Sequence, residues 1–259
     1  LGPTDGGLAG VSILIWPEAA LPFFLSEYPE ALARFSRMLP PDTLLLTGAP
    51  RRDTIAESDF NSLMAINADG EVVAAYDKQH LVPVGEFLPF QSFLANLGIT
   101  QFVPGLTGWA HGTTPRLMTP EGSPPFLALI CYEALFSGDL GPGTQTAEYI
   151  LNLSNDGWFA GSIGPQQQFH HARLRAVETG LPMVRVANTG ITALIDPFGQ
   201  ILGQVTPDEM GVLDGALPAR IDPPLFERWQ HWPFWMALLV STGLVLVYRF
   251  RAGRRPPLT

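Results

Sequence analysis

Cys131 is the only cysteine in the chain, and it follows an apolar run at residues 126–130 that predicts a buried strand. The carboxyl ends of such strands form the sheet edge at which open α/β sheets bind their ligands. A free cysteine is also a common small packing residue. The position of Cys131 therefore leaves a structural and a chemical role equally open.

Two further residues, an acidic and a basic one that could assist a reactive cysteine, also follow predicted strands. Glu18 comes shortly after the apolar run 11–16, and Lys78, the only lysine beside 14 arginines, follows the predicted strand 71–76. A thiolate is the reactive form of cysteine, and a carboxylate in a partly apolar pocket can remove the thiol proton. A lysine ammonium would lower the pKa of the thiol and stabilise an oxyanion. Taken singly, Glu18 and Lys78 are ordinary surface residues, but the three together indicate catalysis by a cysteine nucleophile.

The elements that would position these residues are short strands and helices. Apolar runs predict strands at residues 11–16, 43–48, 61–67, 71–76, 126–131, 149–153, 183–187, 191–196, 200–205 and 211–217. The spacing of apolar residues predicts helices at 27–39 and 165–179, and Asp69-Gly70 is typical of a hairpin turn. This order of elements predicts an α/β layer fold.

The composition excludes several classes of function. The net charge is −9, which argues against a nucleic-acid partner because phosphate binding needs a basic surface. A single cysteine excludes a disulfide framework and a cysteine-rich zinc site. The five histidines have no spacing typical of metal ligands, so we expect neither a metal nor another cofactor.

The C-terminal segment is predicted to span a membrane. Residues 232–248 carry no charged side chain and are mostly apolar, which is just long enough to cross a bilayer. Trp229, Trp232 and Trp235 at one end and Tyr248 at the other are typical of membrane interfaces, and four arginines follow. A buried core helix is the alternative, and it leaves the aromatic ends and the arginine tail unexplained.

These features predict a catalytic domain at 1–228, a transmembrane helix at 229–250 and a cytoplasmic basic tail at 251–259. Because arginine-rich flanks stay in the cytoplasm, the domain is expected on the outer side of that membrane. The chain starts at Leu1 without a methionine or a signal peptide. We therefore expect it to be the C-terminal part of a longer protein with upstream membrane helices.

Four motifs in one collinear order resemble the Glu-Lys-Cys signature of the nitrilase, or carbon–nitrogen hydrolase, superfamily. They are Trp-Pro-Glu at 16–18, Asp-Lys-Gln-His-Leu-Val-Pro-Val-Gly-Glu at 77–86, Ile-Cys-Tyr-Glu at 130–133 and Ser-Asn-Asp-Gly-Trp-Phe at 154–159. Within that superfamily, the Cys-Tyr-Glu motif and the terminal helix with its arginines resemble the apolipoprotein N-acyltransferase family. The resemblance implies an α-β-β-α sandwich that faces the periplasm from the bacterial inner membrane.

The resemblance also implies a reaction. An acyl chain passes from a membrane phospholipid, typically phosphatidylethanolamine, to Cys131 as a thioester, and then to the N-terminal amine of the S-diacylglyceryl-cysteine of an apolipoprotein. Glu18 is the implied general base, and Lys78 is the implied oxyanion partner. Four further residues are implied to support the site or bind substrate: Glu86, Tyr132, Glu133 and Trp158.

Two other functions remain compatible with the sequence. The first is a membrane-anchored carbon–nitrogen hydrolase, an amidase acting on a small substrate, although such an enzyme needs no membrane helix. The second is a non-catalytic receptor or assembly module, against which the intact set of Glu18, Lys78 and Cys131 argues. An acyltransferase should also have a lipid-facing lid, and the long loop after Lys78 supplies candidates. They are Phe87, Leu88, Phe90, Phe93 and Leu94.

Overall fold

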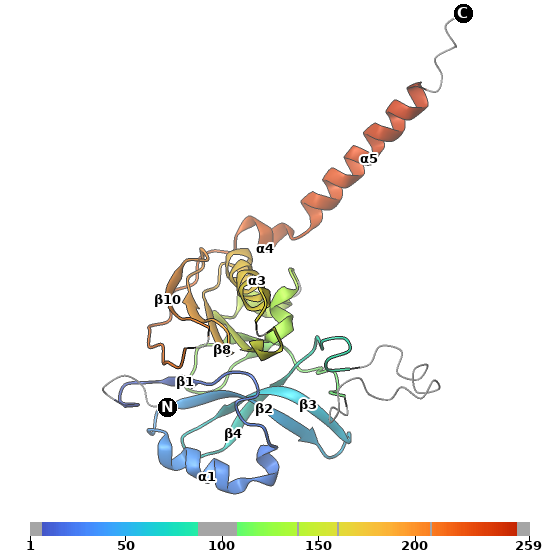
Figure 1. Ribbon diagram of the computed structural model, residues 1–259. Helices are drawn as coiled ribbons and strands as arrows, with labels where there is room; N and C mark the ends of the chain where they lie inside the picture. The colour runs from blue at the N-terminus through green and yellow to red at the C-terminus, as the bar shows by residue number, and fades with distance from the viewer. Residues whose placement is uncertain (1–6, 88–107, 139, 160, 208, 253–259) are drawn as a thin grey trace, which may run out of the picture.

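The chain forms two layers of β-sheet with helices on their outer faces, and one long helix projects from the domain (Figure 1). The computed structural model describes residues 7–87, 108–138, 140–159, 161–207 and 209–252. The arrangement is the α-β-β-α sandwich that the sequence motifs imply.

The first sheet contains four strands in the order β1-β2-β3-β4. β1 runs parallel to β2, and the other neighbours are antiparallel. Gly70 lies in the turn between β3 and β4 with a φ of 79°, a backbone conformation that glycine adopts without strain. The bounds are β1 (Ile13–Ile15), β2 (Leu44–Asp53), β3 (Ser58–Ile66) and β4 (Val72–Asp77).

The second sheet contains six strands in the order β10-β9-β8-β7-β6-β5. The three central strands, β6, β7 and β8, are parallel, and the outer strands are antiparallel to their neighbours. The bounds are β5 (Leu117–Met118), β6 (Phe126–Ile130), β7 (Tyr149–Asn155), β8 (Met183–Asn188), β9 (Thr192–Ile195) and β10 (Ile201–Val205).

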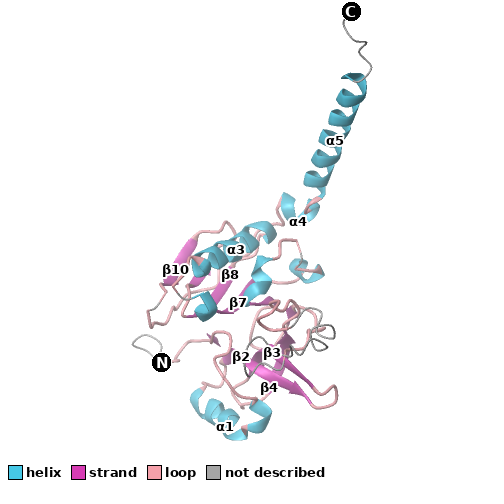
Figure 2. Cartoon of the chain, turned by 45° about the vertical axis from the view of Figure 1, so that its right-hand side comes forward, coloured by secondary structure: helices cyan, strands magenta, loops and turns pink. Residues whose placement is uncertain are grey.

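The helices lie outside the sheets or extend away from them (Figure 2). In the described part of the chain, the α-helices are α1 (Pro29–Met38), α3 (Gly164–Thr179), α4 (Leu225–Trp229) and α5 (Trp232–Ala252). The described residues also form short 3₁₀-helices, η1 (Leu25–Glu27), η2 (Cys131–Leu135), η3 (Pro142–Gln145) and η4 (Asp156–Phe159).

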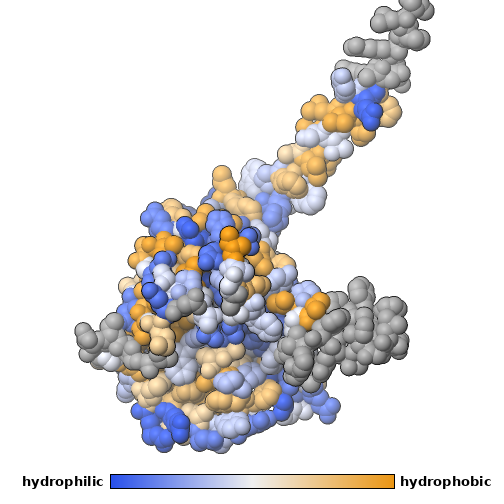
Figure 3. Space-filling model, viewed as in Figure 1, coloured by the Kyte–Doolittle hydropathy of each residue, from blue (hydrophilic) through white to orange (hydrophobic). Residues whose placement is uncertain are grey.

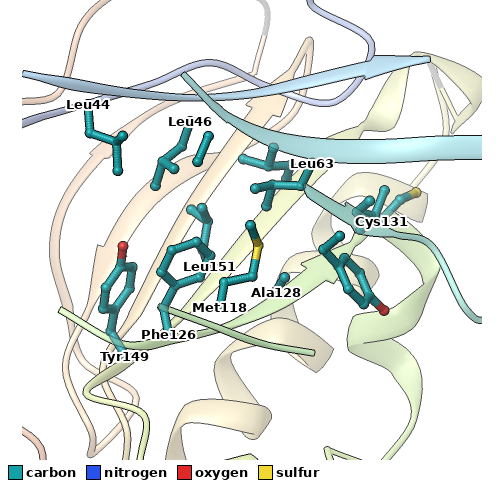
Figure 4. Packing of buried hydrophobic residues seen from close by; sticks show 13 residues of the cluster. Leu44, Leu46, Leu63, Met118, Phe126, Ala128, Cys131, Tyr149 and Leu151 are labelled. Atoms are coloured by element: carbon teal, nitrogen blue, oxygen red, sulfur yellow. The ribbon is translucent and has the colours of Figure 1, made fainter. Parts of the chain in front are cut away.

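The strand β6 shows how alternating side chains build two cores. Phe126, Ala128 and Ile130 face the first sheet, where they pack in the cluster drawn in Figure 4. Leu127 and Leu129 point the other way and pack in the cluster under α3. Because both faces of β6 are buried, its sequence is a continuous apolar run rather than an alternating one. Each fully buried leucine stabilises the fold by about 1.5–3 kcal/mol.

The two outer helices cover the remaining faces of the sheets. Phe35 of α1 packs with Leu45 and Met64 of the first sheet. Ala172 and Ala176 of α3 pack in the cluster that contains the outward side chains of β6. Both sheets are therefore fixed between a shared inner core and an outer helix, which holds the ends of their strands in place.

The helix α5 differs from the rest of the structure because it projects from the domain (Figure 1) and its described side chains, at residues 232–250, are exposed. The segment Trp232–Phe250 has a mean hydropathy of 1.5 and no buried residue. Figure 3 shows hydrophobic side chains along the projecting helix. By length and composition, this helix is long and apolar enough to cross a membrane. The predicted boundary at residue 229 falls at the end of α4, and residues 253–259 of the predicted tail lie outside the described residues.

One predicted strand is wrong. Residues 211–217 form no strand in the structure, although their composition is apolar. Leu213 lies against Gly203 of β10, where a Cβ on the glycine would approach the leucine within 2.9 Å. The segment therefore covers the sheet through side-chain contacts, and Gly211 and Gly215 weaken its tendency to form a strand.

Candidate active site

Cys131 is the first residue after β6, at the point where the chain turns into η2. Its φ is 50°, a left-handed conformation that non-glycine residues rarely adopt and that costs about 1–3 kcal/mol. Only 6% of the residue is exposed. Figure 4 shows Cys131 at the end of the row of core side chains. The fold thus holds the thiol at a strained turn on the sheet edge.

Glu133 holds this turn in place. Its Oε2 accepts a hydrogen bond of 2.8 Å from the backbone N–H of Ile130. Its Oε1 accepts hydrogen bonds from the Tyr76 hydroxyl at 2.8 Å and from the backbone N–H groups of Gln79 at 2.9 Å and His80 at 3.1 Å. Burial raises the pKa of Tyr76, and the charge of Glu133 raises it further, so Tyr76 keeps its proton. Glu133 therefore connects the end of β6 to the segment that follows β4.

Glu18 lies in the loop after β1 and is 5% exposed. Its Oε2 accepts a 2.7 Å hydrogen bond from the backbone N–H of Asn155, and its Oε1 accepts one of 2.7 Å from Asn61 Nδ2. Gly48 of β2 permits this position, because a Cβ there would lie 2.6 Å from the Glu18 Cα. Both sheets thus contribute to the placement of one carboxylate.

Lys78 directly follows β4 and is 1% exposed. Its Nζ lies 2.8 Å from Glu86 Oε1 and 3.5 Å from Glu18 Oε1. Asn61 Nδ2 also donates to Glu86 Oε1 at 3.2 Å, so it bridges the two carboxylates. Burial lowers the pKa of Lys78, but the charges of Glu18, Cys131 and Glu86 raise it more strongly, and the net shift is upward. Lys78 is therefore a buried cation at neutral pH.

The thiol of Cys131 is affected by the negative charge of Glu18 and by the positive charge of Lys78. Burial raises the pKa of this thiol, and the carboxylate of Glu18 raises it further. The Lys78 ammonium and a hydrogen bond from Gln168 oppose these effects, but the net shift is upward. The resting thiol is therefore protonated, and a reaction at sulfur needs a base. Glu18 and Lys78 are in direct contact and both act on Cys131, so the structure brings the three predicted residues together.

Three residues that the sequence did not single out also belong to this site. Asn61 bridges the two glutamates, and Gln168 Nε2 donates a 3.2 Å hydrogen bond to Cys131 Sγ. The hydroxyl of Ser154 also lies within hydrogen-bonding reach of the sulfur. Ser154 opens the motif at 154–159, which gave a signal for it, whereas Gln168 lies inside a helix and Asn61 inside a strand.

A buried ion pair supports Ser154. The Ser154 hydroxyl donates to Asp156 Oδ1 at 2.6 Å, and Arg185 Nη2 lies 2.8 Å from Asp156 Oδ2. Arg185 also donates to Asn152 Oδ1, and the side chains of Arg185 and Asp156 are fully buried. Gly190 leaves the space for this pair, because a Cβ there would lie 2.0 Å from Asp156 Oδ2. Within the described ranges, no three His, Cys, Asp or Glu side chains could hold a metal ion.

The two aromatic residues implied by the motifs have different surroundings. Tyr132 is partly buried and makes an edge contact with Phe136, with ring centroids 5.1 Å apart. Trp158 lies in η4 and is 63% exposed. Phe159 and Ile163 are also exposed, so three large apolar side chains reach the surface shortly after Asn155, whose backbone N–H binds Glu18.

The predicted lid is only partly described. The ring of Phe87 lies 5.3 Å from that of His111 in an edge contact. The remaining predicted lid residues, Leu88, Phe90, Phe93 and Leu94, lie outside the described residues. The role of this loop stays a prediction.

Comparison with known proteins identifies relatives over nearly all of the chain. The sequence model of the family described as carbon-nitrogen hydrolase matches residues 6–223. The chain is 43% identical to the apolipoprotein N-acyltransferase of Bradyrhizobium diazoefficiens and 42% identical to that of Rhodopseudomonas palustris. Each match covers 99% of this chain and 48% of the relative. The chain therefore spans about half the length of the curated relatives that it matches.

Solved structures support the same fold. An amidase from Nesterenkonia sp. is similar with a TM-score of 0.52 and 17% identity, covering 77% of this chain and 75% of that chain. A carbon-nitrogen hydrolase from Helicobacter pylori G27 has a TM-score of 0.57 and 13% identity, again covering 77% of this chain and 75% of that chain. At these identities the similarity establishes a shared architecture and leaves the substrate open.

Proposed function

Because the chain belongs to the carbon–nitrogen hydrolase family, we propose that Cys131 is the nucleophile of an apolipoprotein N-acyltransferase. The extent of the similarity carries this proposal. The family match ends at residue 223, before α4 and α5, whereas the match to the Bradyrhizobium acyltransferase covers 99% of the chain and so includes α5. An amidase with a small soluble substrate would have no use for that helix.

The first half of the reaction forms a thioester. Glu18 takes the proton of the Cys131 thiol, and the sulfur attacks the carbonyl carbon of a phospholipid ester, typically of phosphatidylethanolamine. Lys78 Nζ and the backbone N–H of Tyr132 stabilise the oxyanion. The carbon–oxygen bond breaks, and Glu18 gives its proton to the leaving alkoxide. A lysophospholipid departs, and the acyl chain remains on Cys131.

The second half transfers the chain to the lipoprotein. The free α-amine of S-diacylglyceryl-cysteine attacks the thioester carbonyl, and Glu18 takes a proton from the amine nitrogen. The carbon–sulfur bond breaks, the sulfur leaves as a thiolate, and Glu18 returns the proton to it. The products are an N-acylated lipoprotein and the free thiol of Cys131. One base at one position therefore serves both halves.

The other polar residues support these steps. The 2.8 Å contact with Glu86 supports a role in fixing the Lys78 ammonium. The hydrogen bonds of Glu133 to both sides of the Cys131 turn support a role in holding the nucleophile in its strained conformation. Neither glutamate needs to exchange a proton with substrate in this scheme.

A membrane location suits both substrates, because each carries lipid chains. We propose that α5 anchors the domain in the bacterial inner membrane and that the domain faces the periplasm. The exposed apolar helix, its aromatic N-terminal end and its arginine-rich C-terminal side support this orientation. The exposed side chains of Trp158, Phe159 and Ile163 support contact with acyl chains. The greater length of the relatives supports further membrane helices upstream in the full-length protein.

The decisive experiment follows the acyl group. Full-length protein in detergent is incubated with phosphatidylethanolamine that carries a labelled acyl chain, and Cys131→Ala serves as the variant. We expect wild-type protein to gain the mass of one acyl chain, which neutral hydroxylamine removes as it does from thioesters. The variant should gain none. Addition of a diacylglyceryl lipopeptide should then move the label to the peptide amine.

Two results would contradict the proposal. Labelling of Cys131→Ala equal to wild type would exclude Cys131 as the acyl carrier. Wild-type protein that hydrolyses a small amide but leaves the phospholipid and the lipopeptide unchanged would instead identify the amidase function.

A further inference from the structure

Gln168 contacts the reactive sulfur from a helix that the motifs do not include. It lies in the second turn of α3, which packs against η2. Its Nε2 is 3.2 Å from Cys131 Sγ, and the residue is 5% exposed. A neutral amide thus donates an N–H to the sulfur at a buried position. This hydrogen bond becomes stronger when the sulfur is a negatively charged thiolate.

The other end of the same amide is unusual. Among the described residues, Gln168 Oε1 is buried and has no hydrogen-bond partner. An unpaired buried acceptor is unfavourable, and an apolar side chain of similar size would avoid that cost. Packing alone therefore does not account for a glutamine here, and the contact of its N–H with Cys131 is the feature that a leucine or a methionine could not provide.

Two other groups near the sulfur, Ser154 and Lys78, also have carboxylate partners. The Ser154 hydroxyl lies within hydrogen-bonding reach of the sulfur, but it has a single hydrogen and donates to Asp156 at 2.6 Å. The Lys78 ammonium lies against Glu86 at 2.8 Å and Glu18 at 3.5 Å. Gln168 differs from both because the described hydrogen bond of its N–H, at 3.2 Å, is to the sulfur itself.

We propose that Gln168 is a further catalytic residue, whose amide N–H stabilises negative charge on Cys131 Sγ. The charge arises twice, when Glu18 removes the thiol proton and when the carbon–sulfur bond of the thioester breaks. The inference rests on the proposed acyl transfer for its role in turnover. Its physical content, an amide that favours the thiolate, holds for any reaction at this sulfur.

The test compares the reactivity of the thiol in Gln168→Leu and Gln168→Met with wild type. The rate of alkylation by iodoacetamide is measured against pH in full-length protein, by mass spectrometry of the peptide that contains Cys131. Loss of one hydrogen bond to a charged atom should raise the midpoint by about one pH unit, which is about tenfold less thiolate at a given pH. Gln167→Leu, at an exposed position of the same helix, should leave the midpoint unchanged.

A second measurement separates chemistry from packing. Because both variants remove a buried unpaired oxygen, we expect their thermal midpoints to equal or exceed that of wild type while thioester formation slows about tenfold. An alkylation midpoint that stays at the wild-type value in both variants would overturn the inference. The alkylation assay needs no acyl donor, so a shifted midpoint in a protein without acyl transfer would remove the proposed function and leave this role of Gln168 standing.

Discussion

Glu18 and Glu133 lie in two buried polar regions next to Cys131. The two regions differ in how many hydrogen-bond donors surround each carboxylate. Glu18 accepts two hydrogen bonds, one at each oxygen, and its nearest cation is 3.5 Å away. Glu133 accepts four hydrogen bonds, with an arginine nitrogen also at 3.5 Å from Oε1. Its partners are Tyr76, Gln79, His80, Ile130 and Arg116.

The difference indicates which glutamate can exchange protons. A carboxylate oxygen offers about two lone-pair positions, and three of the four donors around Glu133 meet at Oε1, while the fourth meets Oε2. The charge of Glu133 thus serves four hydrogen-bond donors and Arg116 at a buried position, where the loss of a partner is unfavourable. Glu18 retains free positions beside the thiol. Two glutamates with similar burial are therefore suited to different tasks, one to proton transfer and the other to holding the backbone.

The largest expected effect tests the first half of this comparison. In Glu18→Gln, the rate of thioester formation should fall by about 10²–10⁴-fold, because no base accepts the thiol proton. The pKa of Cys131 should fall as well, since the negative charge of Glu18 disfavours the thiolate and the amide has no charge. Alkylation by iodoacetamide at a fixed pH below that pKa should therefore become faster while acyl transfer becomes slower.

Opposite signs are the informative outcome. If acyl transfer and alkylation both slowed, Glu18 would act through the structure of the site rather than as a base. Glu30→Gln is the matched control, because Glu30 is an exposed glutamate on α1. It should change neither rate.

The next effect concerns stability and tests the second half of the comparison. Glu133→Gln should lower the free energy of unfolding by about 3–5 kcal/mol, because a glutamine cannot accept hydrogen bonds at both ends and leaves Arg116 without its charge partner. For a domain of this size the thermal midpoint should fall by roughly 6–20 °C. Circular dichroism against temperature measures it, with Glu18→Gln as the comparison, whose midpoint should move much less. A Glu133→Gln protein that melted with wild type would show that the carboxylate is not needed to hold the turn.

Much of the site could be predicted from sequence because its main residues follow elements with clear patterns. Cys131 and Lys78 lie directly after strands whose apolar character marks their ends, and Glu18 follows β1 closely. Strand ends that meet at one sheet edge bring such residues together. The resemblance of four motifs added Glu86 and Glu133, and the structure gives both of them contacts in the site.

The missed residues depend on packing between elements, which no local pattern encodes. Gln168 reaches the sulfur only because α3 packs against η2 at one particular rotation, and its two neighbours Gln166 and Gln167 are exposed. Asn61 is a polar residue inside a strand, and its contacts with two glutamates come from loops far away in the sequence. The apolar residues 211–217 show the reverse error, because their composition predicts a strand that side-chain packing replaces.

The smallest expected effect on the reaction rate concerns Glu86, whose role we expect to be intermediate between those of Glu18 and Glu133. Glu86 Oε1 contacts Lys78 and Asn61, and Oε2 accepts a 2.8 Å hydrogen bond from the backbone N–H of Val82. A glutamine has only one oxygen, so in Glu86→Gln either Lys78 and Asn61 or the N–H of Val82 loses its hydrogen-bond acceptor. This loss of about 1.5–3 kcal/mol of hydrogen-bond energy should slow thioester formation roughly ten- to hundredfold. The charge of Glu86 also raises the pKa of Lys78, so its removal lowers that pKa. Lys78 then loses its proton at a lower pH. In a plot of the rate of thioester formation against pH, the fall in rate at high pH should therefore begin at a lower pH than in wild type. If the rate falls at the same high pH as in wild type, or if the thermal midpoint is as low as that of Glu133→Gln, Glu86 has a structural role like that of Glu133.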